Sequence, residues 1–248
     1  MPIETPIDLL MRQLSEAGLR PKEHLVKQIL AHGEAAVPAL AQLATAFGDL
    51  HDGEEPLCYG PIHALRLLGE LGSPAAVAPL LQALPVPVYE PDEESGYVDV
   101  PGTLWGSEVL QSVARCGEEI GPFLWAWADD EQNSLVSRGA ALQGLAYVAT
   151  LRDQRAAIID EARRRLELGG TPIVMAGLVN LLADLGDKPS YGVIMAAYRA
   201  GIVDQGRMAA AIARQLLLSG GRPDLTCVNH SLWERYEQHG PGPSAEQR

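Results

Sequence analysis

The feature that most constrains this chain is a punctuated pattern that returns three times: a glycine, a few small or acidic residues, a proline and an apolar run. Gly adopts the left-handed conformation that ends a helix, and Pro is tolerated in the first helical turn, where amides lack intrahelical partners. Each copy therefore predicts two helices separated by a stop. Neither helix buries its apolar stripe alone, so neighbouring pairs must stack. The copies are HGEAAVPALAQLA (32–44), LGSPAAVAPLLQAL (71–84) and CGEEIGPFLWAWA (116–128), with a fainter echo at Gly186.

The rest of the chain also reads as helix, because hydrophobic residues make up 47% of it but aromatics only 5%, which favours helix over sheet. We predict an all-α fold, an α-α superhelix that forms one body over residues 1–218, with a loosely ordered C-terminal tail over 219–248. Within the tail, Ser231 and Glu234 predict a capping box for a short helix that packs Trp233 against the last repeat. The expected helices, about twelve, cover roughly 5–17, 21–31, 35–47, 61–71, 74–84, 104–116, 119–128, 133–150, 154–168, 172–185, 188–200 and 204–218.

Two stretches carry a family resemblance. The run HALRLLGELGSPAAVAPLLQAL (63–84) resembles the HEAT-like repeat of the phycobilisome-lyase type. Together with YGPIHALRLLGELG (59–72), the segment VMAGLVNLLADLGDKPSYGVIMAAYRAGIVD (174–204) resembles an uncharacterised bacterial HEAT-repeat family. The resemblance covers about residues 20–215 and implies a HEAT-like repeat solenoid. It also implies a binding or scaffolding role and supplies no catalytic residues.

The charge of the chain limits the kinds of partner that it is expected to bind. The net charge is −13, which argues against nucleic acid and against anionic membrane surfaces, since both need basic protein surface. Residues 1–131 carry 6 Lys and Arg against 21 Asp and Glu, whereas residues 132–248 carry 13 against 11. No apolar stretch is long enough to span a bilayer, no signal peptide is visible, and the three scattered cysteines fit a reducing compartment. We therefore expect a bacterial cytoplasmic protein.

Two acidic loops, 48–60 and 85–103, each follow the second helix of a pair, so both should emerge at one edge. Such an edge attracts basic partners, and nearby aromatic side chains are typical of interfaces. The competing interpretation is a solvated edge that only aids solubility. The candidate partner-binding residues are Asp52, Glu54, Glu55, His63, Glu93, Glu94, Trp105 and Trp125.

A polar stripe marks the helix over 61–71, where His63, Arg66 and Glu70 share one face. The stripe is either exposed, with an Arg66–Glu70 ion pair, or it faces a ligand. Metal-ligand residue types also gather between positions 51 and 63, but their spacing matches no zinc or calcium motif. Since nucleophile elbows and nucleotide-binding loops are absent from the sequence, we expect no catalytic residue, metal or cofactor. The metal-ligand types are His51, Asp52, Glu54, Glu55, Cys58 and His63.

Three functions compete. The first is a non-catalytic scaffold or adaptor that binds a protein or peptide, preferably basic, through the acidic edge and an apolar groove; pairing of acidic and less acidic halves in a homo-oligomer is a further option. The second, from the resemblance, is a lyase or isomerase acting on a tetrapyrrole-like chromophore. The third is a nucleic-acid enzyme on a HEAT scaffold, which the negative charge opposes. We expect the first.

Overall fold

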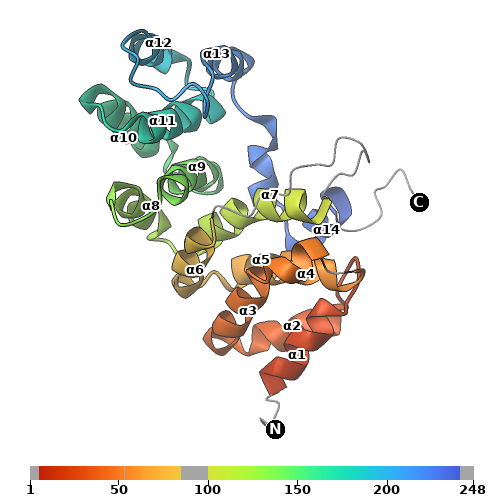
Figure 1. The fold of residues 1–248 in the computed structure, drawn as a ribbon. Helices are drawn as coiled ribbons and strands as arrows, with labels where there is room; N and C mark the ends of the chain where they lie inside the picture. Colours follow the sequence, from red (N-terminus) through yellow and green to blue (C-terminus); the bar gives the residue numbers. More distant parts are fainter. Residues whose placement is uncertain (1–5, 53, 85–99, 241–248) are drawn as a thin grey trace. The chain divides into compact units, whose positions relative to one another are not determined.

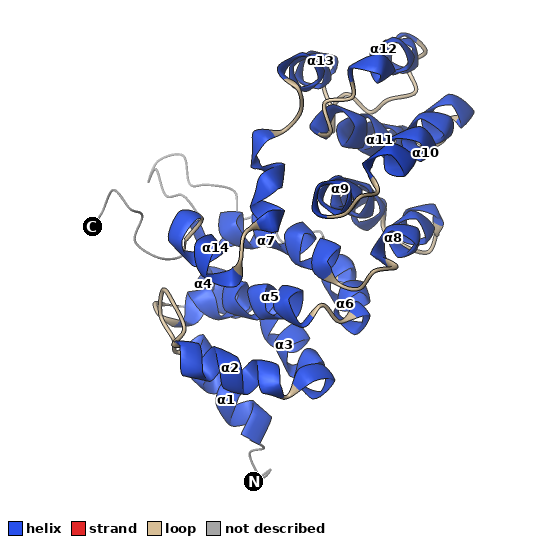
Figure 2. Ribbon diagram, turned by 180° about the vertical axis from the view of Figure 1, so that it is seen from behind, coloured by secondary structure: helices blue, strands red, loops and turns tan. Residues whose placement is uncertain are grey.

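The computed structural model describes residues 6–52, 54–84 and 100–240. In these ranges the chain forms fourteen α-helices and five 3₁₀-helices, with no strand (Figures 1 and 2). The all-α prediction is confirmed. None of the described helices is both long and apolar enough to cross a bilayer. The chain divides into two compact units: residues 1–117 together with 230–248, and residues 118–229.

In the first unit, α5 is the central helix. It contacts α3 and α7 most extensively and also touches α1, α2, α4 and α14. Most of α5 is therefore buried, including its polar residues His63 and Arg66. The helices are α1 (Pro6–Ser15), α2 (Glu23–Ala31), α3 (Val37–Ala44), α4 (Phe47–Asp52), α5 (Gly60–Leu71), α6 (Val77–Gln82), α7 (Val100–Arg115) and α14 (Leu232–Gln238), with 3₁₀-helices η1 (Gly33–Ala36), η2 (Leu57–Tyr59) and η3 (Pro74–Ala76).

The second unit is a ladder of paired helices. Helix α9 packs on α8 and α11, α10 packs on α11 and α12, and α13 packs on α11. These contacts make the second unit an array of helices that pack on one another. The helices are α8 (Ile120–Asp129), α9 (Leu135–Leu151), α10 (Arg155–Leu168), α11 (Pro172–Asp184), α12 (Tyr191–Arg199) and α13 (Ala210–Ser219), with 3₁₀-helices η4 (Lys188–Ser190) and η5 (Pro223–Asn229).

The predicted glycine stops are present. Gly72 ends α5 with φ +65°, and its N–H donates to the Leu68 carbonyl at 3.0 Å. The glycine of the faint echo, Gly186, also has a positive φ, and a Cβ there would lie 2.2 Å from the carbonyl group of Gly220. The pattern read from the sequence therefore marks real chain reversals, and one of them is also a point of close backbone approach.

Several boundaries differ from the sequence prediction. The first acidic loop contains α4 and η2, and the last helix of the ladder begins at Ala210 rather than near residue 204. The tail contains η5 and α14, and the predicted capping box of Ser231 and Glu234 is present. The Trp233 ring lies 4.7 Å from the guanidinium of Arg20, in the first unit.

Candidate functional site

In the polar stripe of α5, Glu70 is exposed but Arg66 is buried. His63 is fully covered. Its Nε2 lies 2.7 Å from the Gly18 carbonyl oxygen, which can only accept, so Nε2 carries the proton. Nδ1 then accepts from the Tyr236 hydroxyl of α14 at 2.8 Å. Burial lowers the pKa of His63 to about 4. His63 is therefore neutral, both of its nitrogens are occupied, and it does not face a partner as predicted.

Arg66 pairs with a different residue from the one predicted. Its guanidinium is fully buried, and Nε donates to Oε1 of Glu108 on α7 at 2.8 Å, with a second, shorter contact from Nη2. The same guanidinium lies 4.4 Å from the ring centre of Tyr236, a cation–π geometry. Instead of the predicted Glu70, the carboxylate that pairs with Arg66 is Glu108 of α7.

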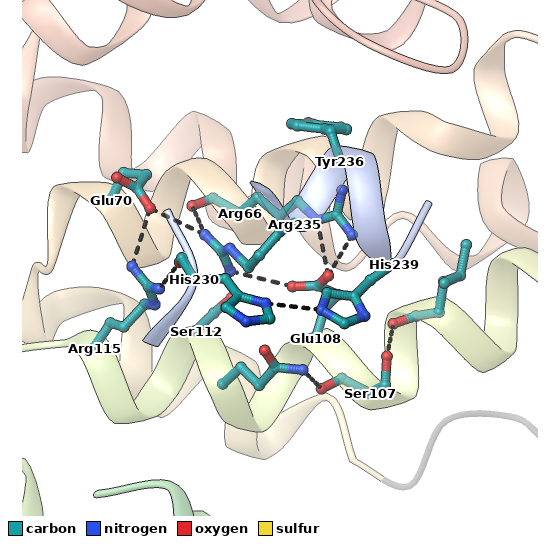
Figure 3. Close-up of polar contacts among 12 residues, drawn as sticks. Arg66, Glu70, Ser107, Glu108, Ser112, Arg115, His230, Arg235, Tyr236 and His239 are labelled. Carbon is teal, nitrogen blue, oxygen red and sulfur yellow. Dashed lines mark hydrogen bonds and ion pairs between the residues drawn. The ribbon is translucent and has the colours of Figure 1, made fainter. Parts of the chain in front are cut away.

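Arg235 of α14 joins the cluster (Figure 3). Its Nη1 donates to Oε2 of Glu108 at 3.2 Å, and its Nη2 donates to Oε1 of Glu70 at 3.1 Å. Arg115 at the end of α7 donates to the same Glu70 oxygen at 3.1 Å and also contacts the His230 carbonyl oxygen. Burial and the neighbouring Arg235 lower the pKa of Arg115. Three arginines thus share two carboxylates.

We define the polar clamp as His63, Arg66, Glu70, Glu108, Arg115, Arg235 and Tyr236. Its members come from α5, α7 and α14, and Arg66, Glu70, Glu108, Arg115 and Arg235 lie together in Figure 3. His63 joins them through its contact with the Tyr236 hydroxyl. Arg66, Arg235 and His63 are 0% exposed and Glu108 is 1% exposed, so no substrate reaches these groups while α14 is in place. The clamp holds the C-terminal helix against α5 and α7.

Trp105 is also buried, contrary to its assignment as a partner-binding residue. It is 0% exposed, its Nε1 donates to the Ala44 carbonyl at 2.6 Å, and Phe47 contacts its ring edge-on at 5.3 Å. Glu54 and Glu55 are exposed as predicted, and Glu55 accepts from the Tyr59 hydroxyl at 2.8 Å.

The other predicted loop residues have separate outcomes. Asp52 is the last residue of α4, but its side chain lies outside the described residues, as do Glu93 and Glu94 entirely. Cys58 is buried, and burial, with a contribution from Glu55, raises the pKa of its thiol. The predicted metal-ligand types therefore do not assemble among the described side chains.

Trp125 is half-buried and lines a cavity of about 250 Å³ between α8 and α10, in the second unit. Two exposed carboxylates, Glu118 and Glu119, stand at the start of α8 on the wall of this cavity. Pro122 and Ile158 supply apolar wall. We call this cavity the Trp125 groove.

The Trp125 ring already holds one cation. The Arg165 guanidinium of α10 lies 4.4 Å from the ring centre and is fixed by Glu161 at 2.6 Å and by Asp129. Sequence reasoning identified Trp125 but missed the two glutamates. The sequence did contain a feature that could have identified Glu118 and Glu119: they directly follow Gly117, the glycine of the third repeat copy.

No family model matches the chain, and neither a curated protein nor a solved structure matches it. The resemblance to HEAT-like repeats therefore gains no support from a family match, and the chromophore-lyase alternative rests on that resemblance alone. The arrangement of helices supports the broader statement that the described chain is an all-α helical array.

Proposed function

We propose that this protein is a non-catalytic, HEAT-like helical scaffold that binds a basic peptide segment of a protein partner. The observation that carries the proposal is the Trp125 groove, where an aromatic ring, apolar walls and two exposed glutamates meet. Stacked helix pairs offer such grooves repeatedly along an extended surface, which is why this fold class suits adaptors.

A lysine or arginine side chain matches the groove in charge. Trp125 offers an indole ring of a kind that binds guanidinium groups, and Arg165 shows that its surface does so here. Glu118 and Glu119 add opposite charge beside it. The acidic excess of residues 1–131 is of the sign that speeds the encounter with a basic partner.

The test uses the full chain and a short fluorescent peptide rich in lysine and arginine. Trp125→Ala should weaken peptide binding by about tenfold, the effect of losing a partly desolvated cation–π contact. Glu118→Gln combined with Glu119→Gln should mainly slow association and flatten its salt dependence. Fluorescence anisotropy and stopped-flow measurements separate the two effects.

Phe123→Ala is the matched control, because Phe123 is an aromatic residue of α8 that is 40% exposed and does not line the groove. It should leave peptide affinity unchanged. Equal binding of an acidic peptide, or equal losses in the Phe123 and Trp125 variants, would contradict the proposal.

A further inference from the structure

Helix α14 buries three side chains, and two of them, Arg235 and Tyr236, make polar contacts with α5 and α7. Arg235 is 0% exposed and Tyr236 is 2% exposed. Arg235 reaches both Glu70 and Glu108, and Nη2 also approaches the Arg66 carbonyl at 3.4 Å. This pattern of charge-assisted hydrogen bonds is specific for the side chains that α14 presents. The face formed by α5 and α7 therefore binds α14 through specific side-chain contacts, in the way that a protein binds a short helical peptide.

Not every polar atom of the closed clamp is hydrogen-bonded. Among the described side chains, several buried polar atoms in and beside it have no hydrogen-bond partner, and each such atom destabilises the closed arrangement relative to a hydrated one. Nε of Arg235, which belongs to α14, and Nη1 of Arg66, whose guanidinium lies under the Tyr236 ring, regain water when α14 moves away. The helix has only seven residues, too few to persist alone, so it unfolds on release and gains conformational entropy. The atoms are Nη1 of Arg66, Oε1 of Gln111, Oγ of Ser112 and Nε of Arg235.

We infer that α14 is a releasable clamp, and that its release uncovers on α5 and α7 a docking face for a partner helix carrying an arginine followed by a tyrosine. Without α14, Glu70 and Glu108 lose a guanidinium, the Arg66 guanidinium loses its aromatic face, and His63 Nδ1 loses its hydroxyl donor. An Arg–Tyr pair restores all of these contacts. This inference is independent of the Trp125 groove.

The test adds, in trans, a fluorescent peptide of residues 229–240 to the full chain. Tyr236→Phe in the protein removes one hydrogen bond from its own α14 and should raise peptide affinity by about tenfold, because opening becomes easier. The same change in the peptide should lower affinity by a similar factor, and Arg235→Gln in the peptide should abolish binding.

Tyr198→Phe is the matched control, because it also removes a tyrosine hydrogen bond, to the Met208 carbonyl at 2.7 Å, but in the second unit. It should not change peptide affinity. Hydrogen exchange on the unmodified protein supplies an independent measurement: amides of α14 should exchange about 100-fold faster than the central amides of α5.

Two results would overturn the inference. If α14 exchanges as slowly as α5 and neither the unmodified nor the Tyr236→Phe protein binds the peptide, then α14 is a permanent core element. If the peptide with Arg235→Gln binds as well as the original, the face does not select the proposed partner chemistry.

Discussion

His63 acts as a neutral bridge between the turn after α1 and the C-terminal helix. Its two ring nitrogens have opposite roles, one donating to Gly18 and the other accepting from Tyr236. A protonated imidazole donates from both nitrogens and therefore does not fit this pair of partners as they stand. Proton binding at His63 is thus coupled to the contact between α5 and α14.

The stability of the first unit should therefore depend on pH. The pKa of His63 is about 4 in the folded chain, against a usual value of 6.5, so the unfolded chain binds the proton more strongly. The stabilisation from neutral His63 is complete above pH 6.5 and is lost as the pH falls through 4, by about 3 kcal/mol in total. Urea unfolding between pH 7 and pH 4 measures it. His63→Gln should remove this component, and an unchanged pH dependence in that variant would assign the effect to other groups.

Gly186 makes a second prediction at the scale of one residue. Its φ of +63° and the 2.2 Å approach of the Gly220 carbonyl group leave no space for a Cβ. Gly186→Ala should destabilise the second unit by about 3 kcal/mol or more, since backbone strain and a backbone clash combine. Gly192→Ala is the control, because nothing lies within 4 Å of that position in α12. Thermal unfolding of both variants tests this, and equal melting temperatures would show that the chain relaxes at Gly186.

At the scale of elements, Trp105 fastens α7 to the α3–α4 region through its ring and its indole N–H. Trp105→Ala should cost about 3–5 kcal/mol, as expected for truncation of a fully buried aromatic side chain. Trp125→Ala in the partly exposed groove should cost much less, so the pair separates a folding role from a binding role. Denaturant unfolding of the two variants measures the difference; similar losses would mean that Trp125 also belongs to the core.

Local signals in the sequence predicted local structure well. Gly72 and Gly117 do end helices with positive φ, and the capping box at Ser231 forms, because each depends only on neighbouring residues. Helical spacing places His63, Arg66 and Glu70 on one face of α5, but it did not predict that His63 and Arg66 are buried. What covers that face was not predictable, because Arg235 lies 169 positions beyond Arg66 and no short-range pattern links them.

The same limit applied to the arginines of α10. Three consecutive arginines, Arg163, Arg164 and Arg165, have different surroundings on this helix. Arg163 bonds Asp187 at 2.6 Å and the Ser190 hydroxyl at 2.8 Å, Arg164 stays exposed on Glu161, and Arg165 stacks on Trp125. Successive helix positions point in different directions, so each arginine meets a different neighbour, and the tertiary contacts decide its role.

At the scale of the whole molecule, the chain forms two units. It enters the second unit after residue 117 and returns to the first unit after residue 229. The clamp and the Trp125 groove lie in different units, so variants of one should leave the other intact when both are measured in the same protein. The two binding proposals can therefore be tested separately on the full-length chain.

This connectivity also has a consequence for biosynthesis. Arg66 and Glu108 leave the ribosome well before Arg235, which is made only after the whole of residues 118–229. The unit that is translated first is therefore the last to be completed, the reverse of the usual N-to-C order of domain folding. Until residue 235 is made, the surface of α5 and α7 that binds α14 is uncovered in the nascent chain. During that time a cellular factor that recognises this surface can bind to it.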